Sequence, residues 1–195
     1  MESVTKTRIL ESALVSFALN GYKGTNLRDL AAQLNLSKSA LYRHFDSKEA
    51  IWDAVMDMME TYYTERFGSV QNLPKVPDSP DELLEMTMRM LDFTMHDEKV
   101  KLTRRLLLTE QYHDERVRAL AAQHFLTGTK AMYTIIFEGM MQKGVLKRDD
   151  PAMLAFIYTA PITELVHACD REPDKEPEFT AQIEAFVRHF IKTYC

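Results

Sequence analysis

The sequence predicts an all-α protein of about nine helices, with a small N-terminal domain ahead of a larger helical one. Two observations predict this class. Apolar residues recur at intervals of three and four along almost every long segment, whereas strand-like alternation of apolar and polar residues is absent. Clusters of Gly, Asn, Asp, Ser and Pro interrupt this pattern, so each apolar stretch is interpreted as a separate helix.

The first two helices are predicted from their ends. An apolar face along residues 5–19 indicates the first helix, and the pair Asn20-Gly21 ends it, because glycine adopts the left-handed cap conformation at little cost. Asn26 is a favourable N-cap for a second helix that runs to about Leu34.

Two further helices follow a tight turn at Asn35-Leu36. Ser37 is expected to cap a short third helix that ends near Phe45, and Ser47 is expected to cap a fourth helix over residues 48–67. Two short helices joined by a tight turn are the arrangement that a helix-turn-helix needs.

The helix-turn-helix has a predicted inner and outer face. The apolar residues that would pack inward are Ala31, Leu34, Leu36, Leu41 and Phe45. Hydrogen-bond donors would face outward at Arg28, Lys38, Ser39, Tyr42, Arg43 and His44. No acidic residue lies between Ser37 and Phe45, so the outer face suits the phosphates and base edges of DNA.

Composition and charge narrow the class of protein. The chain has 195 residues, 46% hydrophobic and 27% charged, which suits a globular protein with a substantial core. Its net charge is −5, but residues 1–50 hold seven Lys and Arg against five Asp and Glu, and residues 51–195 carry −7. A basic N-terminal region on an acidic remainder is compatible with a small DNA-binding module.

No membrane association or secretion is expected. No uncharged apolar run approaches the roughly 20 residues that a membrane span requires. The N-terminus carries no signal-peptide core, and the two cysteines, Cys169 and Cys195, lack metal-ligand spacing. A cytoplasmic protein is therefore expected.

Residues 17–51 contain a more specific pattern. Its elements are Gly21-Tyr22 with Thr25, Leu30-Ala31, Ser37, Leu41-Tyr42, His44-Phe45 and Lys48-Glu49. In type and spacing they resemble the N-terminal DNA-binding domain of the tetracycline-repressor (TetR) family. Asn35 stands where family members usually have glycine, and asparagine also tolerates the left-handed conformation that such a turn needs.

The resemblance implies a homodimeric transcriptional regulator, most often a repressor that a small molecule releases from a palindromic operator. Residues 1–47 would form the DNA-binding domain and residues 48–195 the ligand-sensing and dimerisation domain. The residues that would contact DNA are Thr25, Arg28, Ser37, Lys38, Ser39, Tyr42, Arg43, His44 and Lys48. Among them, Lys38, Ser39 and Arg43 would contact bases. Neither a cofactor nor a metal, nor any catalytic residue, is expected.

The larger domain is rich in methionine and aromatic residues, which suit an adaptable ligand pocket and an irregular core equally well. If there is a pocket, the candidates to line it are Met90, Phe93, Tyr133, Phe137, Phe156 and Tyr158. This composition favours an apolar or amphipathic effector.

The last two predicted helices, residues 151–171 and 179–194, each carry an apolar stripe. In the family such a pair from each subunit forms a four-helix dimer interface. The predicted interface residues are Ile162, Val166, Ile183, Phe186, Val187 and Phe190. The alternative is that the terminal helix packs on its own core. Pro161 is expected to kink the earlier helix.

One pattern suggests a different class, a helical metal-binding protein or enzyme. Glu110 and His113, and likewise Glu164 and His167, form Glu-x-x-His pairs of the kind that ferritin-like di-iron sites use. Two such pairs are only slightly more than chance produces at this glutamate content. The metal site therefore remains an alternative that the sequence does not favour.

Overall fold

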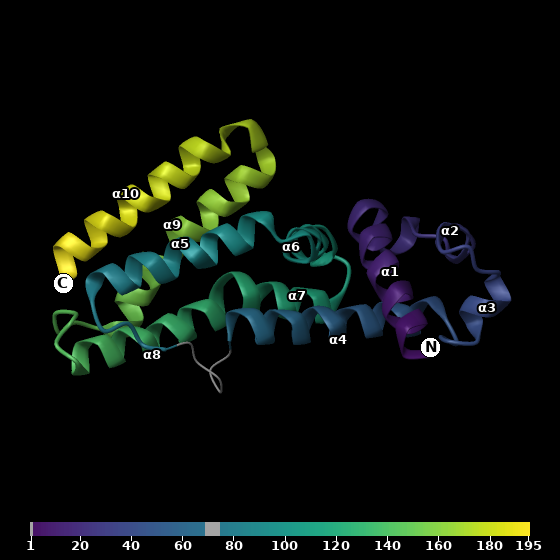
Figure 1. Cartoon of the computed structure of the whole chain (residues 1–195), viewed down its shortest axis with the longest axis horizontal. Helices are drawn as coiled ribbons and strands as arrows, with labels where there is room; N and C mark the ends of the chain where they lie inside the picture. The colour runs from purple at the N-terminus through teal and green to yellow at the C-terminus, as the bar shows by residue number, and fades with distance from the viewer. Residues whose placement is uncertain (1, 69–74) are drawn as a thin grey trace. The chain divides into compact units, whose positions relative to one another are not determined.

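The computed structural model describes residues 2–68 and 75–195, with side chains from residue 5 onward, and within these ranges it is helical and has no strand. Figure 1 shows its helices, which are α1 (Glu2–Gly24), α2 (Leu27–Gln33), α3 (Lys38–Tyr42), α4 (Lys48–Phe67), α5 (Pro80–His96), α6 (Glu98–Glu110), α7 (Glu115–Ala122), α8 (Gly128–Gln142), α9 (Pro151–Arg171) and α10 (Glu176–Tyr194). A π-helical segment, Gln123–Thr127, joins α7 to α8 without a break. The predicted all-α class is confirmed.

Two helix ends differ in detail from the prediction. Helix α1 extends to Gly24, although its backbone leaves the helical region at Gly21, where φ is 70° and ψ is 171°. Helix α3 ends at Tyr42, and residues up to Phe45 continue only as turns. Helix α9 continues through Pro161 as one helix, and a kink at this residue stays a prediction.

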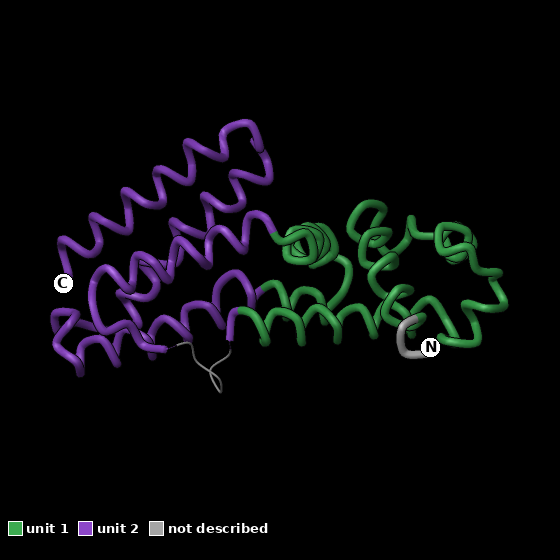
Figure 2. Tube along the Cα trace, in the orientation of Figure 1, with its two compact units in different colours: residues 1–66, 97–121 green, residues 67–96, 122–195 purple. Residues whose placement is uncertain are grey.

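The chain divides into two compact units (Figure 2). Unit 1 comprises residues 1–66 and 97–121, and therefore contains α1 to α4 together with α6 and α7. Unit 2 comprises residues 67–96 and 122–195, with α5 and α8 to α10. A functional boundary at residue 47 stays a prediction, since by packing alone the helix-turn-helix belongs with α4, α6 and α7.

Unit 1 is organised around α1, which packs against α6 and α2. The apolar face of α1 is fully buried at Ile9, Ala13 and Phe17. The ring of Phe17 meets that of Trp52 edge to face, at 4.9 Å between centroids. This core holds the helix-turn-helix on the first turns of α4.

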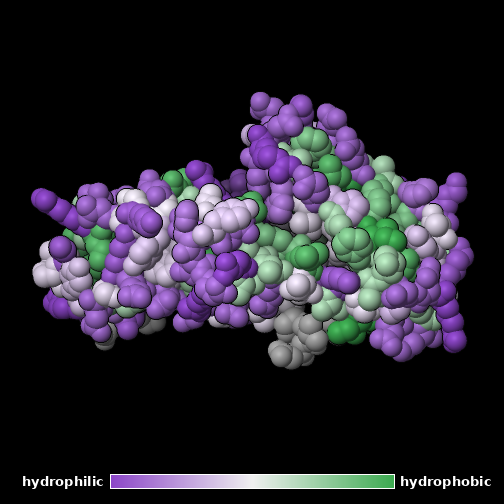
Figure 3. All heavy atoms as spheres, turned by 180° about the vertical axis from the view of Figure 1, so that it is seen from behind, coloured by the Kyte–Doolittle hydropathy of each residue, from purple (hydrophilic) through white to green (hydrophobic). Residues whose placement is uncertain are grey.

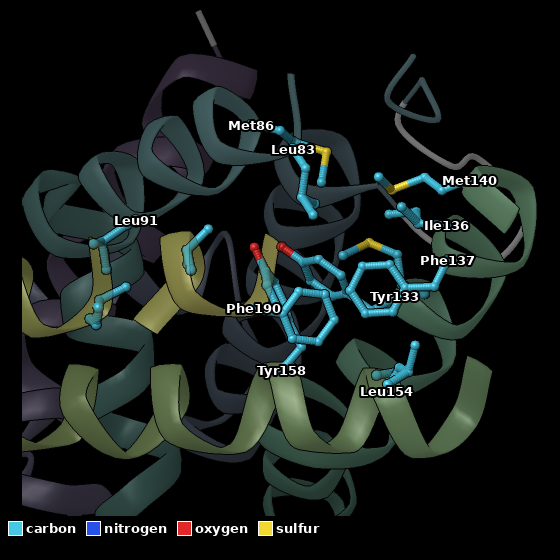
Figure 4. Packing of buried hydrophobic residues seen from close by; sticks show 14 of the residues in the cluster. Leu83, Met86, Leu91, Tyr133, Ile136, Phe137, Met140, Leu154, Tyr158 and Phe190 are labelled. Carbon is cyan, nitrogen blue, oxygen red and sulfur yellow. The ribbon is translucent and has the colours of Figure 1, made fainter. Parts of the chain in front are cut away.

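Unit 2 has an aromatic core (Figure 4). Tyr133 and Phe137 of α8, Tyr158 of α9 and Phe190 of α10 contact one another, with ring centroids 4.7 to 5.6 Å apart. Inside it, the Tyr158 hydroxyl lies 2.6 Å from the hydroxyl of Thr87 on α5. Burial raises the pKa of Tyr133 to about 12, so its hydroxyl is neutral at physiological pH.

His96, the last residue of α5, links that helix to the start of α10 within unit 2. Its Nε2 lies 3.0 Å from Oε1 of Glu176, and its Nδ1 lies 2.9 Å from Oδ1 of Asp92. Hydrogen bonds to Glu176 and then to Asp92 raise the pKa of His96.

We expect this link to be stronger in acid. Because folding raises the pKa of His96, its stabilisation is complete below the unfolded value of about 6.5 and is lost as pH rises through the folded value. The group is exposed, so the effect stays below about 1 kcal/mol. Differential scanning calorimetry of wild type and His96→Gln should show melting temperatures that differ most near about pH 5.5 and converge in alkali. A difference that is independent of pH would contradict this assignment.

Candidate functional site

The turn between α2 and α3 is built by local capping, as the sequence predicts. The side chain of Asn26 accepts a hydrogen bond from the Arg28 amide at 2.8 Å, and Ser37 Oγ accepts one from the Ala40 amide at 3.1 Å. Asn35 has a φ of 56°, the left-handed conformation that the turn requires. These caps set the directions of the two short helices.

The predicted inner and outer faces are confirmed for most residues. Ala31 and Leu41 are buried, and Leu34, Leu36 and Phe45 are half-buried. On the outer face, Arg28, Lys38, Ser39 and Arg43 are exposed, and Tyr42 keeps 39% of its surface exposed. Helix α3 and its C-cap residue Arg43 therefore present two cations, a hydroxyl and a phenol to solvent.

A shallow depression of about 440 Å³ lies where the end of α1, the start of α2, α3 and the start of α4 meet. It is lined by Lys23, Gly24, Thr25, Asn26, Leu27, Lys38, Tyr42 and Lys48. Three of these side chains are ammonium groups and none is a carboxylate. Such a depression attracts an anion, and a nucleic-acid phosphate satisfies its donors.

Aromatic rings lie beside two of these lysines. The ammonium of Lys48 is 4.5 Å from the ring centroid of Tyr22, and that of Lys38 is 5.6 Å from the ring of Tyr42. Partial burial lowers the pKa of Lys48, and the nearby carboxylate of Glu110 acts in the opposite direction.

Four of the nine residues predicted to contact DNA line this depression: Thr25, Lys38, Tyr42 and Lys48. The side chain of Thr25 is buried, and its hydroxyl donates to the carbonyl of Gly21 at 2.9 Å. That hydroxyl holds the end of α1, and a contact of Thr25 with DNA stays a prediction.

Two other predicted residues have a structural side to their role. Ser37 Oγ is the N-cap acceptor of α3 and lies 2.9 Å from Oγ of Ser39. His44 is half-buried, and its Nδ1 has no hydrogen-bond partner among the residues that the structure describes.

Lys23 was not among the predicted residues, and yet it lines the depression. It lies on the short helical turn that follows Gly21, and the interruption of α1 there turns it toward α3 and α4. Its position in the sequence, close to the predicted DNA contact Thr25, could have indicated this role.

Gly21 is needed at this turn for two reasons. Its φ of +70° lies in the region that disfavours side chains, and a Cβ would stand 2.6 Å from Oε1 of Glu110. We expect Gly21→Ala to lower the free energy of unfolding by roughly 1–3 kcal/mol. The matched control is Gly24→Ala, where a Cβ meets only Asn20 at 3.4 Å. Urea denaturation followed by Trp52 fluorescence measures both, and equal losses would contradict this role.

The residues predicted to line a pocket in unit 2 mostly form its core. Tyr133, Phe137 and Tyr158 are buried in mutual contact, and Met90 and Phe93 are half-buried. Phe156 faces outward with 46% of its surface exposed, so it is not part of this cluster. Whether a ligand enters among these residues stays a prediction.

The predicted interface residues require a larger correction. Val166, Ile183, Val187 and Phe190 are buried inside unit 2, so they pack α9 and α10 onto their own core and cannot meet a partner. Ile162 and Phe186 are half-buried. For Ile183, Val187 and Phe190 of the terminal helix, the structure matches the alternative, which is packing on the chain's own core.

A different face of α9 is uncovered. Met153, Phe156 and Ile157 are exposed at spacings of three and four, and Figure 3 shows apolar side chains gathered on the surface of unit 2. By length and composition alone α9 could cross a membrane, and about a third of its apolar stretch is buried in the structure. The sequence predicted no such segment. Helix α9 packs against α8 and α10, as a core helix does.

The two Glu-x-x-His pairs lie in different units. Glu110 lies beside Gly21 in unit 1, whereas Glu164 of unit 2 pairs with Arg171. His167 meets the ring of Phe125 edge to face at 5.0 Å. Within the described ranges no three His, Cys, Asp or Glu side chains are grouped so that they could hold a metal ion.

The N-terminal part of the chain is similar in sequence to known transcriptional regulators. Residues 9–55 match the profile of the bacterial regulatory proteins of the tetR family. YuxN of Bacillus subtilis, an uncharacterised HTH-type transcriptional regulator, is 38% identical over 72 residues, which are 37% of this chain and 24% of YuxN. IcaR of Staphylococcus aureus, the negative transcriptional regulator of the biofilm operon icaADBC, is 44% identical over 48 residues, 25% of this chain and 26% of IcaR. The similarity spans about a quarter of these relatives.

Solved structures extend the likeness of fold to the whole chain. A tetR-family transcriptional regulator from Agrobacterium tumefaciens has a TM-score of 0.71 at 18% identity, covering 100% of this chain and 99% of that one. SmeT, the repressor of the multidrug efflux pump SmeDEF of Stenotrophomonas maltophilia, has a TM-score of 0.67 at 16% identity, covering 97% and 89%. A complex of SmeT with triclosan has a TM-score of 0.73 at 18% identity, covering 98% and 91%.

Proposed function

We propose that this chain, whose residues 9–55 match the tetR family of bacterial regulatory proteins, is a member of that family and acts as a homodimeric, ligand-responsive repressor that binds a palindromic DNA operator in the cytoplasm. The observation that carries the proposal is the lysine-lined depression beside α3. It joins an anion-attracting surface to a short helix with exposed base-reading side chains.

The donors divide into two groups by position. Lys23, Tyr42 and Lys48 surround the depression and would hold a backbone phosphate, which fixes the protein on the duplex. Lys38, Ser39 and Arg43 are exposed on α3 or at its end and would reach base edges in the major groove. Arg28, exposed at the start of α2, can serve either group.

The second half of the proposal concerns the dimer and the effector. Two heads that read successive major grooves need a fixed separation of about 34–36 Å, which a dimer provides. The uncovered face of α9 suits a contact with a second copy, since exposed apolar patches of this kind mark interfaces. An apolar or amphipathic effector is supported by the methionine-rich core of unit 2 and by the triclosan complex of SmeT, a protein of the same fold.

The first test is fluorescence anisotropy on DNA from upstream of the protein's own gene, against scrambled DNA, over a salt series. Specific binding with a steep salt slope is the expected result. Equal binding to both DNAs would support DNA binding by the helix-turn-helix, but it would show that the operator lies in other DNA. Binding to neither at low salt would refute the proposal and direct attention to metal analysis.

Two single variants test the phosphate group of donors. Lys48→Ala and Tyr42→Ala should each weaken binding to specific and scrambled DNA by a similar factor, of about five- to tenfold, because phosphate contacts carry no sequence information. Lys48→Ala should also reduce the slope of log affinity against log salt by about one. Arg105→Ala, an exposed cation on α6, is the matched control and should change neither quantity. Wild-type affinity and salt dependence in both variants would remove them from the DNA surface.

A further inference from the structure

The ammonium of Lys48 is held from one side by a stack of rings. It lies 4.5 Å from the ring centroid of Tyr22, and the Tyr22 ring meets that of Trp52 at 5.0 Å, with 66° between their planes. Phe17 completes the stack, at 6.0 Å from Tyr22 and 4.9 Å from Trp52. A cation over an aromatic face gains electrostatic energy, so the ring favours one position of a side chain that is otherwise flexible.

The other end of the stack is fixed by the carboxylate of Asp114, which directly precedes α7. Trp52 Nε1 donates to Oδ2 of Asp114 at 3.1 Å, while Oδ1 of the same carboxylate accepts from the Val117 amide at 3.0 Å. The second contact is an N-cap of α7. One carboxylate therefore ties the first turn of α7 to the indole that supports Tyr22.

We propose that Tyr22 is a positioning residue of the DNA-binding surface: its ring sets the ammonium of Lys48 at the phosphate-binding depression, and the Trp52–Asp114 hydrogen bond sets that ring. The inference rests on the proposed DNA-binding function. Lys48 lines the depression, while Trp52 and Asp114 stand outside its lining. Tyr22, Trp52 and Asp114 thus act through Lys48 and need not touch DNA.

The alternative is that these stacked rings only form part of the hydrophobic core of unit 1. Trp52 is buried, and loss of packing alone would lower the stability of the unit. The two interpretations differ in one measurable respect. A positioning role acts only through Lys48. Loss of the Tyr22 ring should therefore not change DNA affinity in a variant that already lacks the Lys48 ammonium, whereas general destabilisation lowers affinity with or without Lys48.

The experiment measures the affinity of the full chain for a fluorescent 30-base-pair duplex of random sequence at low salt. Tyr22→Leu is expected to lose about as much affinity as Lys48→Gln, about five- to tenfold, and the double variant no more than either. Tyr22→Phe keeps the ring face and is expected to bind as wild type does. Additive losses in the double variant, or a Tyr22→Phe as weak as Tyr22→Leu, would overturn the proposal.

A second pair of variants avoids the ring stack itself. Asp114→Asn retains one oxygen for the α7 cap, where asparagine is as good as aspartate, but no longer offers two acceptors. Trp52→Phe removes the donor and keeps an aromatic ring. Each should weaken binding by about two- to threefold, with no further loss when they are combined and no effect in the Lys48→Gln background. Equal losses with and without Lys48 would show a merely structural role.

Failure of the positioning role is distinguishable from failure of the proposed function. If wild type does not bind the duplex at low salt, DNA binding itself is refuted. If wild type binds and the folded variants, checked by circular dichroism, bind equally well, then only the positioning role is refuted.

Discussion

Replacing Phe156 and Ile157 with glutamate is expected to convert the protein into a monomer that binds its operator at least about 100-fold more weakly. Both side chains are exposed on α9 and leave apolar surface uncovered in the single chain. Four buried carboxylates at a twofold contact would be costly to desolvate and would repel one another. A monomer binds with a single helix-turn-helix. It therefore loses the gain in effective concentration that the second one provides, which is commonly 10²- to 10⁴-fold.

Multi-angle light scattering measures the mass of the variant, and fluorescence anisotropy measures its affinity for operator DNA. Tyr112→Glu is the matched control, because Tyr112 is a highly exposed aromatic residue of unit 1 and should leave the dimer intact. A double variant that remains dimeric would show that this face of α9 is not the interface. A variant that is monomeric but binds operator as wild type does would show that dimerisation is not needed.

Phe190→Ala is expected to lower the free energy of unfolding by about 3–5 kcal/mol. The ring is 2% exposed and lies 4.7 Å from Tyr158 and 5.4 Å from Phe137, measured between centroids. Its removal leaves a cavity where α8, α9 and α10 meet. Phe190→Leu retains most of the volume and should cost less than about 1.5 kcal/mol.

Urea denaturation followed by circular dichroism measures both variants. If both variants lost a similar, small amount of unfolding free energy, the core would have relaxed around the missing ring. That result would contradict the tight packing described for unit 2. The same burial explains why a charged residue at Phe190 is expected to unfold unit 2, whereas charges at Phe156 and Ile157 are expected to separate two folded chains.

Several features of the helix-turn-helix were predictable because they depend on residues that are neighbours in the sequence. The caps at Asn26 and Ser37 and the left-handed turn at Asn35 follow from side-chain chemistry within three residues of each position. The exposed donors of α3 follow from helical spacing once the helix is located. The role of Thr25 was not predictable in this way, because its hydroxyl donates to Gly21 only after α1 is interrupted there.

Other features depended on contacts between distant segments. The depression gathers Lys23, Lys38 and Lys48 from three different helices, and the carboxylate of Asp114 reaches Trp52 across 62 positions of sequence. No local pattern contains that information. It arises only when α1, α4 and α7 pack in one unit.

By itself, then, the sequence determined the helical class, the helix-turn-helix with its caps, and the cationic character of its outer face, since each follows from the period and chemistry of short segments. Only the tertiary structure decided which apolar stripes are core and which are surface. The stripe of α10 and the face of α9 at Phe156 look alike as sequence. Helix α10 covers its stripe by packing on α5 and α9, while no described residue buries the face of α9, because burial depends on neighbours that a stripe does not name.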